Sequence, residues 1–483
     1  MKISYKTISV KLTKTELLVV FVKEGKKPKL PAGLSLPAQA VKSFSGKIRE
    51  ARFIDVIEGS AARVLLIGLG GGAVDAELLR RGGAMAVKKA EKTGVSNMTF
   101  YMDVALGKHT EKLGQALAEG VVMGAYRLSD FKNTAQPAAL KKVVIQAAAE
   151  FNKGAKCGEV IGGGNVLARR LQDTPANKMR PEDLVTEARQ IAKGSKLITA
   201  KILDEKAMEK LGMGSLLSVS EGSDEPAYLI HLVYKPVKKA KRKICLIGKG
   251  ITYDSGGICI KPSVPLGGMK YDMSGGAAVL GTMHAVAGLE LDVEVHGLVP
   301  ASENLINGSA TKGGDVVTAS NGLTIEVLNT DAEGRLILAD ALAYAEKTIK
   351  PDAMIDLATL TGAVVVALGH ELTGVMGNDK TLTADLIACG EETSEALWPL
   401  PILDAHKKDM KGEVADLKNI SGPGTGAGSS TAGAFLSYFV GDIPWAHLDI
   451  AGSSRHAVGR DYQGGPMGTG VGVRLLVDYI SKQ

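Results

Sequence analysis

Residues 324–347 read TIEVLNTDAEGRLILADALAYAEK, a short apolar run that leads through a polar loop into a helical pattern. We expect a strand at residues 324–328, an extended loop at residues 329–335 and a helix at residues 336–347. Three further apolar strands lead into Gly- or Asp-rich loops in the same half of the chain, at residues 244–247, 293–299 and 354–357. This alternation predicts a mostly parallel or mixed sheet covered by helices, with ligands bound in the loops that follow the strands.

The first third of the chain differs in charge from the rest. Residues 1–150 hold 24 Lys and Arg against 13 Asp and Glu, a net charge of +11, whereas residues 151–483 hold 34 against 39, a net charge of −5. Residues 1–150 also alternate β-type runs with Ala-rich helical stretches, which is typical of an α/β domain.

We therefore predict three parts. These are a smaller N-terminal α/β domain at residues 1–150 with an assembly or accessory role, a connecting segment with a helix at residues 151–172, and a larger catalytic α/β domain at residues 173–483. The three consecutive glycines at residues 162–164 are expected to break the connecting segment before its helix.

Composition excludes several protein classes. The 59 glycines among 483 residues show no Gly-X-Y period, which excludes collagen, and they point instead to turns and close backbone contacts. No apolar run reaches the length that spans a bilayer, so we expect no membrane partner. The longest early apolar run, residues 17–22, is shorter than a signal-peptide core, and we expect a cytoplasmic protein.

Familiar cofactor and protease motifs fail on spacing. The glycine-rich residues 68–72 do not match the dinucleotide-binding fingerprint, and a plain strand-to-helix turn is the better interpretation. His370 and Glu371 lack the second histidine of a zincin, and no P-loop string is present. His447, in an apolar strand pattern, is interpreted as structural.

Two acids in the loop at residues 329–335 are the strongest local signal. In an extended segment Asp331 and Glu333 would point to the same side, and Gly334 would let the backbone approach what they bind. Helix capping is the alternative interpretation, but it explains one acid and not two acids followed by Arg335.

A second charged cluster follows the strand at residues 244–247. Lys249, Asp254, Lys261, Lys270 and Asp272 fall within a glycine-rich loop, and an exposed charged loop is the alternative to a site. Together the two loops supply four carboxylates, enough to hold two divalent ions about 3.5–4 Å apart. Spacing leaves the reaction open, because phosphatases, nucleases and aminopeptidases all use such centres.

The sequence resembles the leucyl aminopeptidase (cytosol aminopeptidase) family over residues 160–480. The resemblance rests on NTDAEGRL at residues 329–336 and on further motifs in the same order: GKGITYDSGG (248–257), IKPS (260–263), MKYDM (269–273), LATLTGA (357–363), ADLKN (415–419) and WAHLDIAG (445–452). It implies a two-metal exopeptidase that hydrolyses peptides with a free N-terminus.

The resemblance also implies the roles of individual residues. The ligands of two metal ions are expected to be Lys249, Asp254, Asp272, Asp331 and Glu333, with Asp254 and Glu333 bridging. Lys261 and Arg335 are the expected catalytic pair, and Arg335 would hold a bicarbonate ion that acts as general base. The metals are expected to be Mn²⁺ or Zn²⁺, with Co²⁺ or Mg²⁺ as further possibilities. An amine ligates only when neutral, and two adjacent dications would lower the pKa of Lys249 accordingly.

The substrate pocket and the assembly follow from the same resemblance. The expected lining residues for a leucine-like N-terminal side chain are Met269, Thr359, Gly362 and Ala451. Family members are homohexamers, and some bacterial members bind DNA, which the basic residues 1–150 would suit. The loop at residues 421–433 departs from the family by lacking an arginine. The rival hypothesis is a nucleic-acid-binding or scaffolding protein with incidental peptidase activity.

Overall fold

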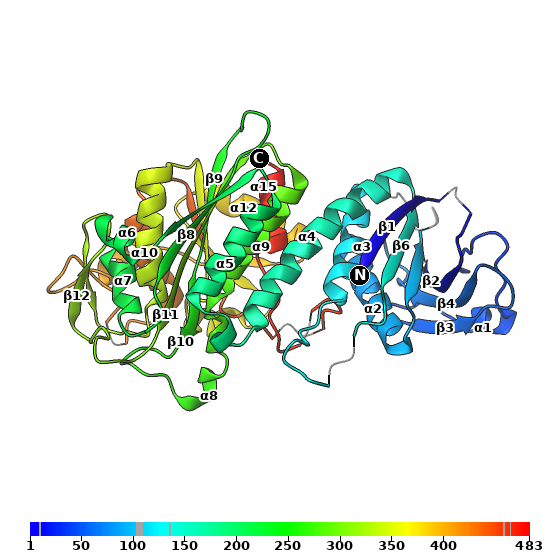
Figure 1. The fold of residues 1–483 in the computed structure, drawn as a ribbon, viewed down its shortest axis with the longest axis horizontal. Coiled ribbons are helices and arrows are strands. Elements are labelled where there is room, and N and C mark those ends of the chain that lie inside the picture. The colour runs from blue at the N-terminus through cyan, green and yellow to red at the C-terminus, as the bar shows by residue number, and fades with distance from the viewer. Residues whose placement is uncertain (9–10, 103–109, 135–136, 423, 457–458, 464) are drawn as a thin grey trace. The chain divides into compact units, whose positions relative to one another are not determined.

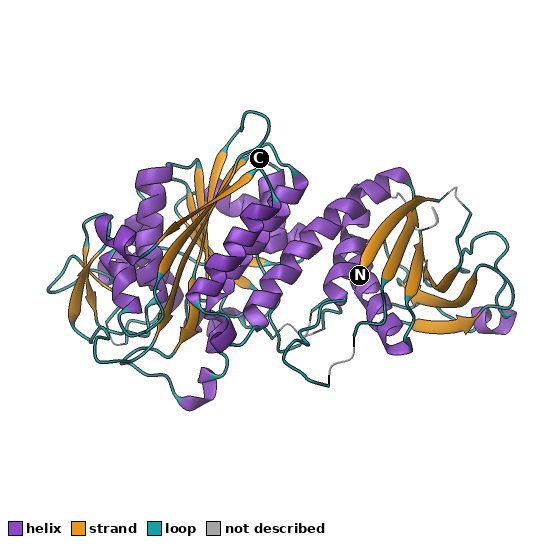
Figure 2. Cartoon of the chain, in the orientation of Figure 1, coloured by secondary structure: helices purple, strands orange, loops and turns teal. Residues whose placement is uncertain are grey.

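The computed structural model describes residues 1–8, 11–102, 110–134, 137–422, 424–456, 459–463 and 465–483 (Figure 1). The chain forms two compact units, which are treated separately below: Met1–Gly163 with Gly459–Gly464, and Gly164–Val458 with Gly465–Gln483. Each unit combines helices with a sheet (Figure 2), which confirms the predicted α/β class with a smaller N-terminal and a larger C-terminal part.

The first unit is built on a six-stranded sheet of order β1-β6-β5-β2-β4-β3. Its strands are parallel except β3, which runs antiparallel to β4. The strands are β1 (Lys2–Thr7), β2 (Thr15–Val22), β3 (Ala51–Asp55), β4 (Ala61–Gly68), β5 (Asn97–Tyr101) and β6 (Lys142–Ala147).

Helices of the first unit cover this sheet. They are α1 (Ala38–Lys42), α2 (Ala76–Thr93), α3 (Glu111–Gly124) and the first part of α4 (Ala149–Asp173). The α2 helix begins where Asp75 accepts a hydrogen bond from Leu78 N at 2.8 Å, and it ends at Gly94 in the left-handed conformation. Leu79 of α2 and Leu117 of α3 are fully buried in one core with Phe100 of β5.

The expected break at glycines 162–164 is wrong, because α4 runs through them without interruption. These glycines serve close packing instead of a turn. A Cβ atom on Gly162 would lie 2.9 Å from Val122 Cβ, and one on Gly164 would lie 2.4 Å from Gly281 O. A helix tolerates glycine where a neighbouring element approaches this closely.

A short segment near the C-terminus, residues 459–463, belongs to the first unit. Tyr462 is fully buried against Ala84 and Met123, and its hydroxyl donates to Glu77 Oε1 at 3.1 Å. Asp461 pairs with Arg49 at 2.9 Å.

The second unit contains a nine-stranded mixed sheet of order β16-β15-β18-β14-β9-β11-β8-β7, with β10 paired to β11. The central strands β18, β14, β9 and β11 are parallel, and antiparallel pairs flank them. The strands are β7 (Ile198–Leu203), β8 (Tyr228–Tyr234), β9 (Lys243–Gly248), β10 (Gly250–Asp254), β11 (Glu294–Asn304), β14 (Ala353–Ala358), β15 (Thr373–Gly377), β16 (Leu397–Pro399) and β18 (Trp445–Asp449).

The expected strand at residues 324–328 forms, but outside this sheet. It is β13 (Thr324–Val327), and it pairs with β12 (Asp315–Thr318) and β17 (Leu417–Lys418) in a separate three-stranded sheet. The segment still leads into a helix, α10 (Gly334–Tyr344), which the short π-helix η4 (Ala345–Ile349) extends.

Helices cover both faces of the large sheet (Figure 1). Alternate residues of β9 face opposite cores: Ile244 packs on one face and Cys245 on the other. The core with Ile244 contains residues of the second part of α4, α5 (Pro181–Gly194), α9 (Ser274–Leu289), α12 (Lys380–Thr393) and α15 (Val473–Ser481). The core with Cys245 contains residues of α6 (Glu205–Lys210), α7 (Gly214–Ser220), α10 and α14 (Gly428–Leu436).

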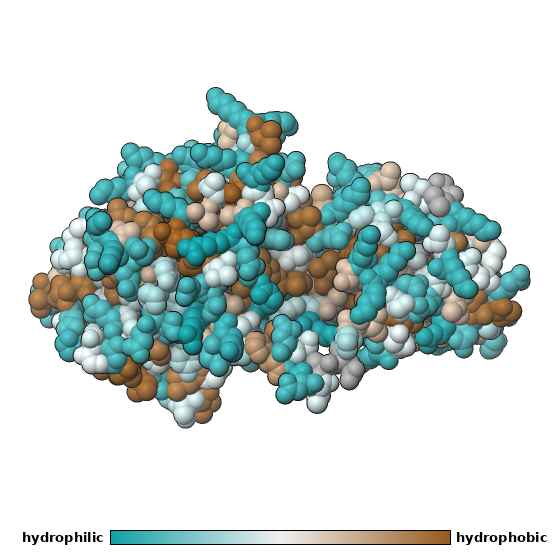
Figure 3. All heavy atoms as spheres, viewed as in Figure 1, coloured by the Kyte–Doolittle hydropathy of each residue, from teal (hydrophilic) through white to brown (hydrophobic). Residues whose placement is uncertain are grey.

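The remaining short elements of the second unit lie in the connections. They are η2 (Ala176–Lys178), α8 (Ser263–Leu266), η3 (Met269–Met273), α11 (Gly362–Leu368), α13 (Asp404–Asp409) and η5 (Ser437–Phe439). Within the described residues, no helix combines the length and the apolar character needed to cross a bilayer. Polar and apolar side chains are interspersed over the visible faces of both units (Figure 3).

Candidate active site

The site residues gather at the carboxyl ends of the parallel strands. Lys249 directly follows β9, and Asp254 ends β10. Thr359 directly follows β14, and Ala451 lies two residues beyond the end of β18. Carboxyl ends of neighbouring parallel strands meet at one edge of a sheet, so residues far apart in the sequence lie around one pocket.

Three buried carboxylates form the centre of this site. One carboxylate oxygen from each of Asp254, Asp272 and Glu333 lies within 4.8 Å of the other two. Asp272 belongs to the η3 turn, and Glu333 directly precedes α10. The structure thus brings together three of the four carboxylates that the sequence suggested.

Asp331 lies beside this cluster and not within it. Residues 330–331 form a turn and not the expected extended loop, so Asp331 and Glu333 are not alternate residues of one strand-like segment. The Asp331 side chain stays 31% exposed at the wall of the same pocket, whereas that of Glu333 is 2% exposed.

Lys249 bridges two of the clustered acids. Its Nζ lies 2.7 Å from Asp272 Oδ2 and 2.7 Å from Glu333 Oε1, and it donates to Thr359 O at 3.1 Å. Burial alone would lower the pKa of Lys249, but Asp272 and Glu333 outweigh burial and raise it. Gly334 makes room for this amine, because a Cβ atom there would lie 2.6 Å from Nζ.

Lys261 connects the outer acids. Its Nζ lies 2.8 Å from Asp254 Oδ2 and also contacts Asp331 Oδ1. Burial would lower the pKa of Lys261, and Asp254 raises it, so that the side chain is a fixed cation at neutral pH. The other Asp254 oxygen accepts hydrogen bonds from Gly256 N and Asn304 Nδ2, both at 2.9 Å.

The donor set fits divalent metal ions. Glu333 Oε2 is buried and has no hydrogen-bond partner in the described part of the chain, which is costly unless a cation faces the oxygen. Burial also raises the pKa values of Asp272 and Glu333, as expected for carboxylates gathered away from water. Carboxylate oxygens are the ligands that hard divalent ions prefer.

Arg335 lies near the start of α10 and is buried. Its Nη1 donates to Asn419 O at 2.7 Å, while its buried Nε has no partner among the described residues. Burial lowers the pKa of Arg335 to about 10, so it remains a cation at neutral pH. A buried guanidinium with an unused donor suits a small anion.

A pocket of about 270 Å³ is lined by the carboxylate cluster and by the expected substrate residues. The expected lining residues Met269, Thr359, Gly362 and Ala451 all line it. Thr359 also donates to Asp272 Oδ1 at 2.7 Å, which joins the pocket wall to the cluster. In the loop at residues 421–433, residues 428–433 begin α14, and Pro423 lies outside the described residues.

Sequence reasoning missed several pocket residues. Ser454 and Arg455 line the pocket and lie two and three residues beyond the motif at residues 445–452, which is the one signal that could have found them. Asn304, which orients Asp254, sits at the end of β11 in no recognisable motif.

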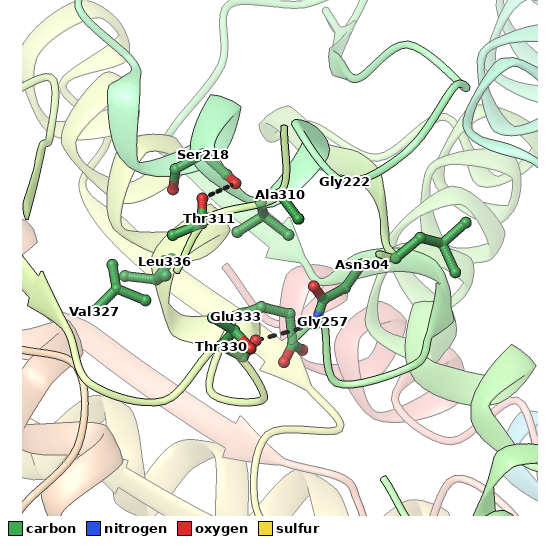
Figure 4. Close-up of a pocket in the computed structure, with 12 residues that line it drawn as sticks. Ser218, Gly222, Gly257, Asn304, Ala310, Thr311, Val327, Thr330, Glu333 and Leu336 are labelled. Carbon is green, nitrogen blue, oxygen red and sulfur yellow. Dashed lines mark hydrogen bonds between the residues drawn. The ribbon is translucent and has the colours of Figure 1, made fainter. Parts of the chain in front are cut away.

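A small second pocket lies beside the cluster (Figure 4). Glu333, Asn304 and Thr330 line it together, and Asn304 Nδ2 donates to Thr330 O at 3.0 Å. Asn304 therefore ties the loop carrying Glu333 to the end of β11. On the opposite side of this pocket, the Thr311 hydroxyl donates a hydrogen bond to Ser218 O at 2.5 Å.

His447 lies inside the sheet. It is fully buried in β18, and its Nδ1 lies 2.6 Å from Asp356 Oδ1 of the neighbouring strand β14. Trp445 Nε1 donates to the other oxygen of Asp356 at 2.7 Å.

Comparison with known proteins identifies the family of this chain. Residues 166–477 match the model of the cytosol aminopeptidase family, catalytic domain, and residues 20–135 match that of the cytosol aminopeptidase family, N-terminal domain. A probable cytosol aminopeptidase of Syntrophotalea carbinolica is 43% identical over 92% of this chain and 90% of its own. Those of Pseudomonas fluorescens strain SBW25 and Chlorobium phaeobacteroides are 38% and 39% identical, over 99% and 100% of both chains.

Proposed function

Because the chain belongs to the cytosol aminopeptidase family, we propose that it releases leucine-like N-terminal residues from peptides with a dinuclear metal centre. Family membership makes the chain a metal-dependent aminopeptidase, a hydrolase that acts on N-terminal residues of peptides. The observation that carries the finer proposal is the buried cluster of Asp254, Asp272 and Glu333 beside two lysines.

The metal-holding residues would be Lys249, Asp254, Asp272, Asp331 and Glu333, with Asp254 and Glu333 shared between two ions. Two ions would supply a water of lowered pKa as nucleophile and would polarise the scissile carbonyl. The unpartnered Glu333 Oε2 supports this assignment. We propose Mn²⁺ or Zn²⁺ as the bound metal. Co²⁺ or Mg²⁺ would also suit oxygen donors, so the metal that is bound depends on which ions are available to the protein.

Lys261 would stabilise the negative charge that develops on the scissile carbonyl oxygen. Its ammonium is held in place by two carboxylates at the pocket wall, so little reorganisation is needed when that charge forms. Electrostatic stabilisation of this kind is usually the largest single contribution to catalysis.

Arg335 has no acceptor atom and cannot act as a base. We propose that its planar guanidinium would hold a bicarbonate ion, which would supply the general base. The buried, unpartnered Nε of Arg335 supports an anion at this position. His447 is already engaged by Asp356 and offers no substitute base.

The side-chain pocket supports a leucine-like preference. Met269 offers a flexible apolar surface, and Gly362 and Ala451 leave room for a branched side chain. The amine of the substrate would face the acidic cluster at the other end of the pocket, which restricts the reaction to the N-terminus.

Two further proposals rest on the resemblance and on charge. A homohexamer is proposed, and light scattering on the purified protein would measure it. A secondary contact with duplex DNA would belong to residues 1–150, with their net charge of +11. Such binding would weaken steeply with salt, and its absence at low salt would remove this role.

The main test is hydrolysis of leucine p-nitroanilide by the full-length protein. Activity should appear with Mn²⁺ or Zn²⁺, disappear on chelation and return when metal is restored. Release of p-nitroaniline that chelation does not change would contradict the proposal.

A further inference from the structure

Arg455 is a cation in the substrate pocket to which neither the family motifs nor the metal cluster assigns a role. It lies three residues beyond the motif at residues 445–452 and lines the pocket with Met269, Thr359 and Ala451. It therefore adds a positive charge to a wall whose other expected members are small or apolar.

Arg455 differs from the two lysines of the pocket in its partners. Lys249 and Lys261, in the same pocket, each contact two carboxylates. In contrast, Arg455 forms no ion pair within the described residues, and its guanidinium stacks over the ring of Tyr271, 5.3 Å from the ring centroid. Stacking leaves the in-plane N–H donors of a guanidinium available to a ligand.

The guanidinium is held in a defined place. Tyr271 cannot swing away, because it is buried and its hydroxyl donates to Asp173 Oδ1 at 3.1 Å. The guanidinium also lies against Gly268, where a Cβ atom would be 2.0 Å from Arg455 Nη1. Two contacts thus position a cation beside the site expected to receive the N-terminal side chain.

The part of the pocket lined by Met269, Gly362 and Ala451 offers small or apolar contacts. Together with one positioned guanidinium, it suits a side chain with an aliphatic stem and a carboxylate end. Glutamate has such a side chain, of a length similar to that of leucine. A carboxylate buried without a partner would be strongly disfavoured, whereas a guanidinium binds it through two parallel hydrogen bonds.

We propose that Arg455 is a specificity-determining residue that lets the pocket accept acidic N-terminal residues, glutamate above all, in addition to leucine-like ones. This inference rests on the proposed aminopeptidase function and names a second substrate class for the same site. It concerns substrate choice and leaves the metal cluster and Lys261 with the roles given above.

The test compares kcat/KM for glutamate p-nitroanilide and leucine p-nitroanilide on the metal-loaded, full-length protein. The wild type should hydrolyse both substrates. Arg455→Met should lower the glutamate-to-leucine ratio roughly tenfold or more, the size expected for a lost charge-assisted hydrogen bond. Arg455→Lys should give a glutamate-to-leucine ratio between those of the wild type and Arg455→Met, because lysine keeps the charge but not the bidentate geometry.

A second variant tests the position of the guanidinium without removing it. Gly268 has an ordinary backbone conformation, φ −95°, so Gly268→Ala should leave the fold intact while displacing the flexible end of Arg455. The glutamate-to-leucine ratio should fall in this variant as well. Arg189→Met, on an exposed position of α5, is the matched control and should leave the ratio unchanged.

The outcomes separate this inference from the proposed function. Hydrolysis of leucine p-nitroanilide with no hydrolysis of the glutamate substrate by the wild type would overturn the role of Arg455 alone. A ratio that Arg455→Met leaves unchanged would do the same. Absence of hydrolysis of both substrates at every metal tried would instead overturn the proposed function, and this inference with it.

Discussion

Lys249 Nζ lies 2.7 Å from Glu333 Oε1, which joins the end of β9 to the start of α10 at the centre of the site. Both side chains are almost fully buried. Removal of one charge would leave the other buried without a partner of opposite charge, which would destabilise the fold. Buried charges of this kind are retained for function more often than for stability, since an apolar pair of the same volume would stabilise the fold as well.

Glu333→Gln should reduce turnover of leucine p-nitroanilide at least about 100-fold. This loss exceeds the one typical of a residue that only hydrogen-bonds to a metal ligand. The amide keeps the shape of the side chain but loses the negative charge that would hold two cations. Steady-state kinetics and metal content, measured on the same sample, check this prediction. A variant with full activity and full metal content would show that Glu333 is not a ligand.

Lys261→Met should lower kcat for the same substrate roughly 100- to 1,000-fold while changing KM little. The reason is that a positioned cation acts mainly on the charge that develops in the transition state. Lys312→Met, which removes an exposed lysine paired with Asp315, is the control and should change neither constant. An increase in KM with unchanged kcat would assign Lys261 to substrate binding instead.

Gly334→Ala should weaken metal binding while the helix still forms, because alanine favours a helix but its Cβ would lie 2.6 Å from Lys249 Nζ. Lys249 is almost fully buried, and any displacement of its amine would disturb the contacts with Asp272 and Glu333. The activity of the variant should require higher metal concentrations than that of the wild type. Gly194→Ala is the matched control, since a Cβ atom there meets no neighbour; equal metal requirements for the two variants would contradict the close contact.

His447→Gln should remove a pH-dependent part of the stability. Burial lowers the pKa of His447, but Asp356 outweighs burial and the pKa is raised. A raised pKa means that the contribution is fully present below the unfolded value, about 6.5, and is lost as the pH rises through the folded value.

The advantage of the wild type over His447→Gln should therefore be roughly 3 kcal/mol near pH 6 and should shrink towards pH 9. Denaturant unfolding of both proteins at the two pH values measures it. An advantage that grows with pH would show that His447 is neutral in the folded protein.

Much of the large sheet was predictable from local pattern. The strands around residues 244–247 and 354–357 are short apolar runs bounded by polar loops, and each forms with an added residue or two at its ends. The strand at residues 324–327 has the same local pattern but pairs with β12 and β17. The choice of pairing partner depends on tertiary contacts that no local pattern contains.

The glycines also show that a local sequence pattern does not contain the tertiary contacts of a segment. A run of three glycines reads as a break, yet α4 passes through it because other elements approach the helix closely. Gly154 is similar: a Cβ atom there would lie 1.7 Å from Glu111 O at the start of α3. The glycine excess therefore serves helix packing in addition to the loops of the site.

The site itself was predictable as a set of residues but not in its arrangement. Asp331 was expected beside Glu333, but a turn at residues 330–331 directs it towards Lys261 instead. Arg455 lies outside every motif and reaches the pocket only because of the chain path after β18. Such positions depend on backbone conformation at single residues.

We propose that this chain holds two metal ions per active site. The most direct measurement is a titration of chelated, dialysed protein with Mn²⁺, followed by calorimetry and by leucine p-nitroanilide hydrolysis. We predict that two equivalents bind per chain and that activity reaches its plateau only as the second site fills. A plateau at one equivalent, or activity independent of added metal, would contradict a centre of two metal ions.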